Sequence, residues 1–154
     1  MKSNKITTYV LWAHHIFDKN WNVNDFINIC EFNTPDAFWK IFNNFGKLCC
    51  LPYRYCVIKK GFPPAWENQK YNKGCILSIL VMKHDALKIW IKLNTLMVTG
   101  NLSTEDNIIA LVYVPKQSND FIKIWCTDSK EKLQSTLSDR FKKKYSNLQI
   151  KYLD

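Results

Sequence analysis

The chain has 154 residues, a formal net charge of +9 and an apolar content of 47%. This length suits a single domain, residues 1–154, built around one core. The N-terminus is polar and no apolar run approaches the roughly 18 residues needed to cross a bilayer, so we expect a cytoplasmic or nuclear protein without a membrane partner. The excess of cations favours an anionic partner such as nucleic acid, although a generally basic surface is the alternative.

Six cysteines are spread over the chain without the spacing of a metal-binding motif. We interpret them as reduced core thiols. A zinc site formed by Cys49, Cys50 and His14 or His15 is the alternative, but adjacent cysteines chelate one metal poorly. We therefore expect neither a metal nor a cofactor.

Strands are predicted at residues 7–16 and 26–32, where β-branched and aromatic residues recur. The loop between them is rich in Asn, Asp and Lys and carries Trp21. This Trp has few apolar neighbours in sequence, so an exposed functional role competes with burial.

Residues 34–46 have the features of a helix, with Thr34 as N-cap, Pro35 at the first helical position and Gly46 at the end. Its apolar stripe at i, i+3, i+4 and i+7 consists of Phe38, Ile41, Phe42 and Phe45. Trp39 is about 100° from this stripe, where it either borders the core or contacts a partner.

Strands at residues 53–60 and 75–81 enclose an irregular segment, 61–74. Pro63 and Pro64 prevent the first strand from continuing, because proline fixes φ and lacks an amide donor. Trp66 and Glu67 follow, so a large ring and a carboxylate lie side by side on a loop.

A second helix is predicted at 85–98, with Asp85 as cap and Ile91 nearer the outside. Residues 107–114 and 121–127 form a hairpin. With a period of two, Ile122, Ile124 and Cys126 face the core while Lys123 and Trp125 share the opposite face.

Residues 129–145 form a third helix with Leu133, Leu137 and Phe141 on one side, and 148–153 form a last strand. Hairpins dominate this order of elements. We therefore predict an α+β fold: a curved antiparallel sheet of about seven to eight strands with three helices on its convex face.

If the helices cover one face, the loops of Trp21 and Trp66 can meet over the concave face, near Lys123 and Trp125. Two indoles then form a slot one base thick, and a base gains roughly 1 to 3 kcal/mol by stacking on one ring. Glu67 can accept two hydrogen bonds from the edge of a guanine.

These residues, from Tyr9 through Pro64-Ala65-Trp66-Glu67 to Trp125, resemble the eukaryotic translation initiation factor 4E family, which binds the 7-methylguanosine cap of mRNA. The resemblance implies that Trp21 and Trp66 sandwich the methylated base, that Glu67 pairs with its edge and that Trp125 contacts the methyl group. It also implies a role in translation initiation in which Trp39 receives a helical peptide of a scaffold subunit or repressor on the convex face. Pro35 and Ile91 are further candidate partner contacts.

Several positions depart from the family pattern. Cys75 replaces a tryptophan, and Pro115 and Lys116 occupy the place of an arginine, so Lys116 and Lys123 are our candidates for holding the cap phosphates. Pro35 and Thr95 replace apolar partner contacts. Both ends look shortened, which leaves open a truncated cap-binding decoy or translational repressor, including a viral one.

Two other classes of function compete with these. A cap-cleaving hydrolase with Glu67 as base would need several carboxylates around a divalent metal, and no such cluster occurs in the sequence, so we expect no enzyme. A structural interaction domain would bury all its tryptophans.

Overall fold

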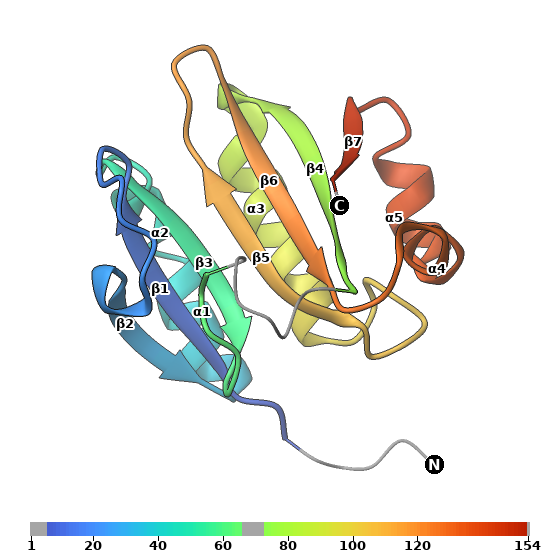
Figure 1. The fold of residues 1–154 in the computed structure, drawn as a ribbon, viewed down its shortest axis with the longest axis horizontal. Coiled ribbons are helices and arrows are strands. Elements are labelled where there is room, and N and C mark those ends of the chain that lie inside the picture. Colours follow the sequence, from blue (N-terminus) through green and yellow to red (C-terminus); the bar gives the residue numbers. More distant parts are fainter. Residues whose placement is uncertain (1–5, 66–72, 154) are drawn as a thin grey trace.

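The computed structural model describes residues 6–65 and 73–153 and contains one seven-stranded sheet (Figure 1). The strands are β1 (Tyr9–His15), β2 (Ile27–Phe32), β3 (Tyr53–Lys59), β4 (Cys75–Met82), β5 (Ile108–Val114), β6 (Asn119–Cys126) and β7 (Ile150–Leu153). This confirms the predicted α+β class and each predicted strand to within a few residues.

The strands pair in the order β2-β1-β3-β5-β6-β4-β7, and every pair is antiparallel. Strands β3 and β4 follow one another in sequence but are separated in the sheet by the β5–β6 hairpin. The connection from β3 to β4 therefore joins two strands that are not neighbours in the sheet. Its sequence includes Trp66 and Glu67, two of the predicted binding residues.

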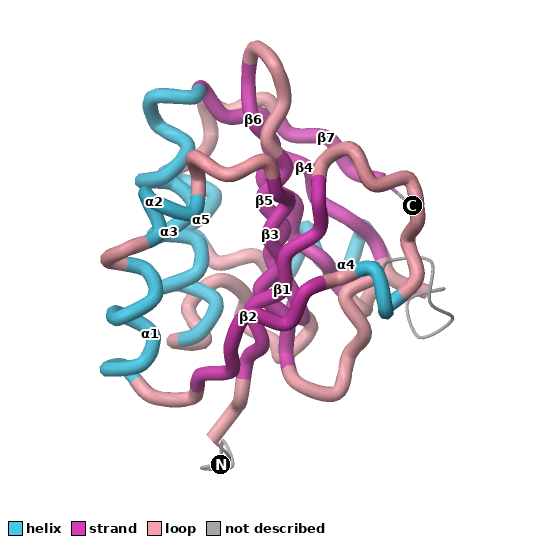
Figure 2. The backbone as a smooth tube through the Cα atoms, turned by 90° about the vertical axis from the view of Figure 1, so that its left-hand side faces the viewer, coloured by secondary structure: helices cyan, strands magenta, loops and turns pink. Residues whose placement is uncertain are grey.

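The two faces of the sheet have different neighbours. In β6, Ile122, Ile124 and Cys126 belong to the main core, whereas Trp125 belongs to a second apolar cluster with residues of β3 and β5. Figure 2 shows α1, α2 and α3 on one side of the sheet only. We call that side the helix face and the other the open face. The predicted alternation along β6 is confirmed.

The first two predicted helical regions differ from expectation in their ends. Thr34 caps α1 (Pro35–Phe42) as predicted, accepting a hydrogen bond from Ala37 N at 3.2 Å. The helix is then interrupted, and α2 (Phe45–Leu48) follows, so Gly46 lies within a helix and does not end one. Helix α3 (Lys83–Val98) starts directly after β4, which places Asp85 in its first turn and not at the cap.

The third predicted helix is two helices, α4 (Lys130–Thr136) and α5 (Asp139–Lys144), which lie beside β7 in Figure 1. Between them Leu137 forms an isolated β-bridge with Ser103, which ends the helical hydrogen bonding. Ser138 then caps α5 by accepting a hydrogen bond from Phe141 N at 3.2 Å. The predicted stripe of Leu133, Leu137 and Phe141 is buried nonetheless.

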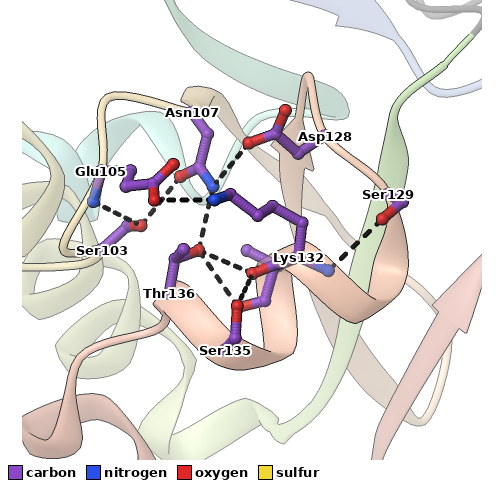
Figure 3. Close-up of polar contacts among 9 residues, drawn as sticks. Ser103, Glu105, Asn107, Asp128, Ser129, Lys132, Ser135 and Thr136 are labelled. Atoms are coloured by element: carbon purple, nitrogen blue, oxygen red, sulfur yellow. Dashed lines mark hydrogen bonds and ion pairs between the residues drawn. The ribbon is translucent and has the colours of Figure 1, made fainter.

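A buried polar cluster attaches α4 to the loop before β5 (Figure 3). The Asn107 amide donates to Thr136 Oγ1 at 2.9 Å and to Asp128 Oδ2 at 3.2 Å, and its oxygen accepts from Ser103 Oγ at 2.8 Å. Asn107 is only 3% exposed, so these bonds replace the water that it loses on folding.

The cysteines occupy three environments. Cys56, Cys75 and Cys126 are buried, Cys30 and Cys49 are half-buried, and Cys50 is exposed. Burial raises the pKa of the Cys30, Cys49 and Cys126 thiols, with Cys49 at about 11. Most of the thiols are therefore protonated at neutral pH, whereas Cys50 departs from the expected core position.

Candidate functional site

The open face contains a cavity of about 650 Å³. Its lining comes from the β1–β2 loop and from β1, β3, β4, β5, β6 and β7, so it extends across most of the sheet. The described residues that line it are His14, Trp21, Phe26, Arg54, Tyr55, Cys56, Pro64, Ile76, Ser78, Leu80, Val112, Val114, Lys116, Phe121, Lys123, Trp125, Gln149, Lys151 and Leu153. The structure thus brings together Trp21, Trp125, Lys116 and Lys123, four of the predicted site residues.

Trp21 lies at one end of this cavity on a loop with its own hydrogen bonds. The Asp18 carboxylate accepts from Asn20 N at 2.9 Å, and the Asp25 carboxylate accepts from Asn22 N at 3.0 Å. Such local side-chain bonds are the reason that Asp and Asn favour turns. They order the backbone on both sides of Trp21, whose side chain remains 42% exposed.

The Trp21 ring stacks on His14, with ring centroids 4.4 Å apart and an angle of 23° between planes. His14 Nε2 lies 2.7 Å from Asn20 O, so this nitrogen carries the hydrogen, and Nδ1 is left to accept from Arg54 at 3.4 Å. The Arg54 guanidinium also lies over the Trp21 ring, 4.8 Å from its centroid. His14 and Arg54 therefore hold the exposed indole in place.

Trp125 and Lys123 form part of the cavity floor on β6. Trp125 is 6% exposed and packs in the apolar cluster of the open face. Burial lowers the pKa of Lys123, and the nearby cations Lys116 and Arg54 lower it further. Three cations are thus held close enough to repel one another, an arrangement that an anionic ligand relieves.

The described residues that line the cavity include four Lys or Arg side chains and no Asp or Glu. Sequence reasoning identified Lys116 and Lys123 but missed Arg54, Lys151 and the stacking role of His14. For Arg54 and Lys151 a signal was present: each lies in a predicted strand, one residue from a side chain that packs in the main core, and so faces the open side.

Trp66 and Glu67, the other two predicted ligand contacts, lie outside the described residues. The last described residues before them are Pro64, which lines the cavity, and Ala65, which is buried. Phe62 packs against the apolar cluster of the open face. The segment after β3 therefore lies on the cavity side of the sheet up to Pro64.

A smaller groove of about 170 Å³ contains two of the three predicted partner residues. Trp39 is 42% exposed and lines this groove with Pro35 of α1 and Thr95 of α3. Ile91 is half-buried against the main core and is not among the groove residues. The groove lies between the N-terminal part of α1, the C-terminal part of α3 and the β1–β2 pair.

The described part of the chain has no group of three or more His, Cys, Asp or Glu side chains that could hold a metal ion. In particular, Cys49 and Cys50 form no such group with His14 or His15. None of the described helices is long and apolar enough to cross a membrane.

The structure thus combines a curved antiparallel sheet with a cavity on its open face whose described lining is basic. Comparison with known families gives a specific result: the profile of the family described as "Eukaryotic initiation factor 4E" matches residues 6–153. The chain belongs to the eukaryotic initiation factor 4E family.

Curated relatives agree with this assignment. The chain is 29% identical over 134 residues to eukaryotic translation initiation factor 4E of Xenopus laevis. This alignment covers 79% of the chain and 62% of the relative. It is 26% identical over 133 residues to eukaryotic translation initiation factor 4E-1A of Danio rerio. This alignment covers 79% of the chain and 61% of that relative. The matched region thus spans about three fifths of the length of these relatives.

Solved structures share the fold. Ascaris suum eIF4E-3, in a complex with an m7G cap, superposes with a TM-score of 0.78 at 22% identity, covering 94% of this chain and 87% of that one. C. elegans eIF4E-3, in a complex with the 4E-binding protein Mextli and a cap analog, superposes with a TM-score of 0.79 at 21% identity. This superposition covers 94% of this chain and 89% of that one.

Proposed function

We propose that this protein binds the 7-methylguanosine 5′ cap of mRNA in the cavity of the open face. The observation that carries the proposal is the combination in that cavity of an exposed, pre-positioned indole, Trp21, with the mutually close cations Arg54, Lys116 and Lys123. No acidic side chain is among the described residues that line the cavity. Membership of the initiation factor 4E family supports the same ligand.

The methylated base is the part of this ligand that the aromatic residues recognise. Methylation at N7 gives guanine a positive charge, and a cationic ring stacked on indoles gains electrostatic attraction beyond ordinary stacking. In our proposal Trp21 and Trp66 hold the base between them and Trp125 contacts the methyl group. Glu67 accepts two hydrogen bonds from the ring N–H and the exocyclic amine.

The triphosphate of the cap carries the negative charge that the cations require. Lys123 in the floor and Lys116 in the β5–β6 turn, two residues after β5, are the proposed phosphate contacts. Arg54 lies close enough to share in them. Each phosphate contact adds salt dependence, so affinity falls as ionic strength rises.

Retention on immobilised 7-methyl-GTP tests the proposal. The wild-type protein is expected to bind and to elute with free 7-methyl-GTP but not with GTP. Glu67→Ala removes a charge-assisted pair and should weaken cap affinity by at least about 2 kcal/mol. Glu105→Ala, which removes an exposed carboxylate that does not line the cavity, is the control. Equal retention of the Glu67 variant and wild type would remove Glu67 from the site.

The groove at Trp39 supports a second element of the proposal, namely that the protein acts in translation initiation by docking a helical peptide of a scaffold subunit. An exposed indole beside an apolar groove is a common anchor for an amphipathic helix. Trp39→Ala should reduce binding of such a peptide at least about 30-fold, the loss of 2 kcal/mol typical of an interface hot spot.

Fluorescence anisotropy of a labelled scaffold peptide measures this binding, with retention on 7-methyl-GTP as the check that the variant is folded. If the wild-type protein bound the cap and no scaffold peptide, the chain would act as a cap-binding decoy or repressor. Incubation of capped RNA with the protein and magnesium is expected to release no methylated nucleotide, because the proposal includes no catalytic step.

A further inference from the structure

A basic strip crosses the open face on the side of the cavity away from Trp21. Ser78 of β4 is directly opposite Lys123 of β6 on one side and Lys151 of β7 on the other. Residues opposite one another in adjacent strands project from the same face. Lys123, Ser78 and Lys151 therefore form one row across β6, β4 and β7, three strands that lie side by side in Figure 1.

An apolar platform lies next to this row. Phe121 is two residues before Lys123 on the same face, and Leu80 is directly opposite it in β4. Both side chains are half-buried and line the cavity. A partly exposed ring beside cations is the arrangement by which proteins bind unstacked bases along a phosphate chain.

Only the far end of the row lies beyond the proposed cap contacts, because Trp125 and Lys123 are both on β6. Measured along the sheet, Lys151 is two strands beyond Lys123, which at about 4.8 Å per strand gives about 10 Å. A cap whose base stacks on Trp21 and whose triphosphate reaches Lys123 would leave Lys151 beyond its last phosphate. The chain that continues in that direction is the RNA itself.

We propose that Lys151, Phe121 and Ser78 form a subsite for the nucleotides that follow the cap. Lys151 pairs with a phosphodiester, the Ser78 hydroxyl lies between the two lysines and the Phe121 ring stacks a base. This inference rests on the proposed cap binding, because the cap fixes the direction in which the RNA runs.

Titrations with two ligands in parallel test the subsite: 7-methyl-GTP and a capped pentanucleotide. Lys151→Gln should weaken binding of the capped pentanucleotide several-fold and reduce the slope of log affinity against log salt by about 0.7, the value for one single-strand phosphate contact. Its affinity for 7-methyl-GTP should stay within twofold of wild type. Lys88→Gln, an exposed lysine of α3, should change neither.

Phe121→Leu provides an independent variant that keeps apolar packing but removes the ring. It should weaken the capped pentanucleotide at least about fivefold, since stacking of one base is lost, and leave 7-methyl-GTP unaffected. Equal losses for both ligands with Lys151→Gln would assign this lysine to the cap triphosphate and overturn the proposal. No loss for either ligand would also overturn it.

The two proposals fail in distinguishable ways. If wild-type protein did not bind 7-methyl-GTP, cap recognition would be wrong, and an uncapped 5′-triphosphate pentanucleotide would then probe the strip alone. Binding of that probe that depends on Lys151 and Phe121 would uphold the subsite, and binding indifferent to both would reject it.

Discussion

Lys123 lies in the floor of the cavity, where burial and the cations Lys116 and Arg54 lower its pKa from the ordinary value of 10.5. Between the lowered pKa and 10.5 the unfolded chain binds more protons than the folded one, so stability rises with pH in that interval. Below the interval Lys123 is charged in both states, so the unfavourable free energy of holding this charge in the cavity floor beside Lys116 and Arg54 reduces the stability of the folded protein in full. An anion bound at Lys123 offsets this cost and raises the pKa again.

The substitution Lys123→Met should separate stability from binding. It keeps the apolar stem and removes the charge, so the free energy of unfolding in urea should be equal to or higher than that of wild type at pH 7. Affinity for 7-methyl-GTP should fall by about 1.5 to 3 kcal/mol, the range for a hydrogen bond to a charged group. Lys88→Met on the helix face is the control. If the variant were less stable than wild type but bound 7-methyl-GTP with unchanged affinity, Lys123 would have a structural role and would not be a phosphate contact.

At the same scale, the sequence allowed some site residues to be predicted and hid others. Lys123 and Trp125 were found because strict alternation along one strand separates core from open face. Arg54 and Lys151 alternate in the same way, but only the strand order reveals that β3 and β7 border the same cavity. His14 was interpreted correctly as a strand residue. Its stacking on Trp21 could not be predicted, because it depends on how the β1–β2 loop folds back over β1.

Among the elements, α4 shows how a polar cluster determines where a helix lies. Asn107 joins Thr136 of α4 to Ser103 and Asp128, and Lys132 of the same helix pairs with Glu105 at 2.8 Å (Figure 3). The apolar stripe of 129–145 predicted one long helix. The residues of the stripe are buried as predicted. The helix, however, is divided into α4 and α5 by the bridge of Leu137 to Ser103 and by the cap at Ser138. Tertiary pairing of this kind leaves no periodic signal.

The substitution Asn107→Ala should destabilise the fold by about 1 to 3 kcal/mol, because it leaves buried polar partners without their hydrogen bonds. Asn101→Ala, on the same loop but exposed, is the matched control and should cost less than about 0.5 kcal/mol. Urea unfolding followed by circular dichroism measures both. Equal midpoints for the two variants would mean that the cluster does not support α4.

On the scale of the whole molecule, the sheet separates two candidate binding surfaces. The cavity lies on the open face, and the Trp39 groove involves α1 and α3 on the helix face. Antiparallel pairing, strand positions and the helix-covered face were predictable because hairpins and amphipathic stripes are local patterns. The insertion of the β5–β6 hairpin between β3 and β4 was not predictable, because it depends on long-range pairing.

The most direct test of the central claim is a titration of intrinsic Trp fluorescence with 7-methyl-GTP and, in parallel, with GTP. Stacking of a cationic base on Trp21 predicts strong, saturable quenching by the methylated nucleotide and much weaker quenching by GTP. Trp21→Phe should reduce the amplitude while the fold, followed by circular dichroism, is retained. Equal, weak responses to both nucleotides would contradict cap binding, although the protein would keep the initiation factor 4E fold.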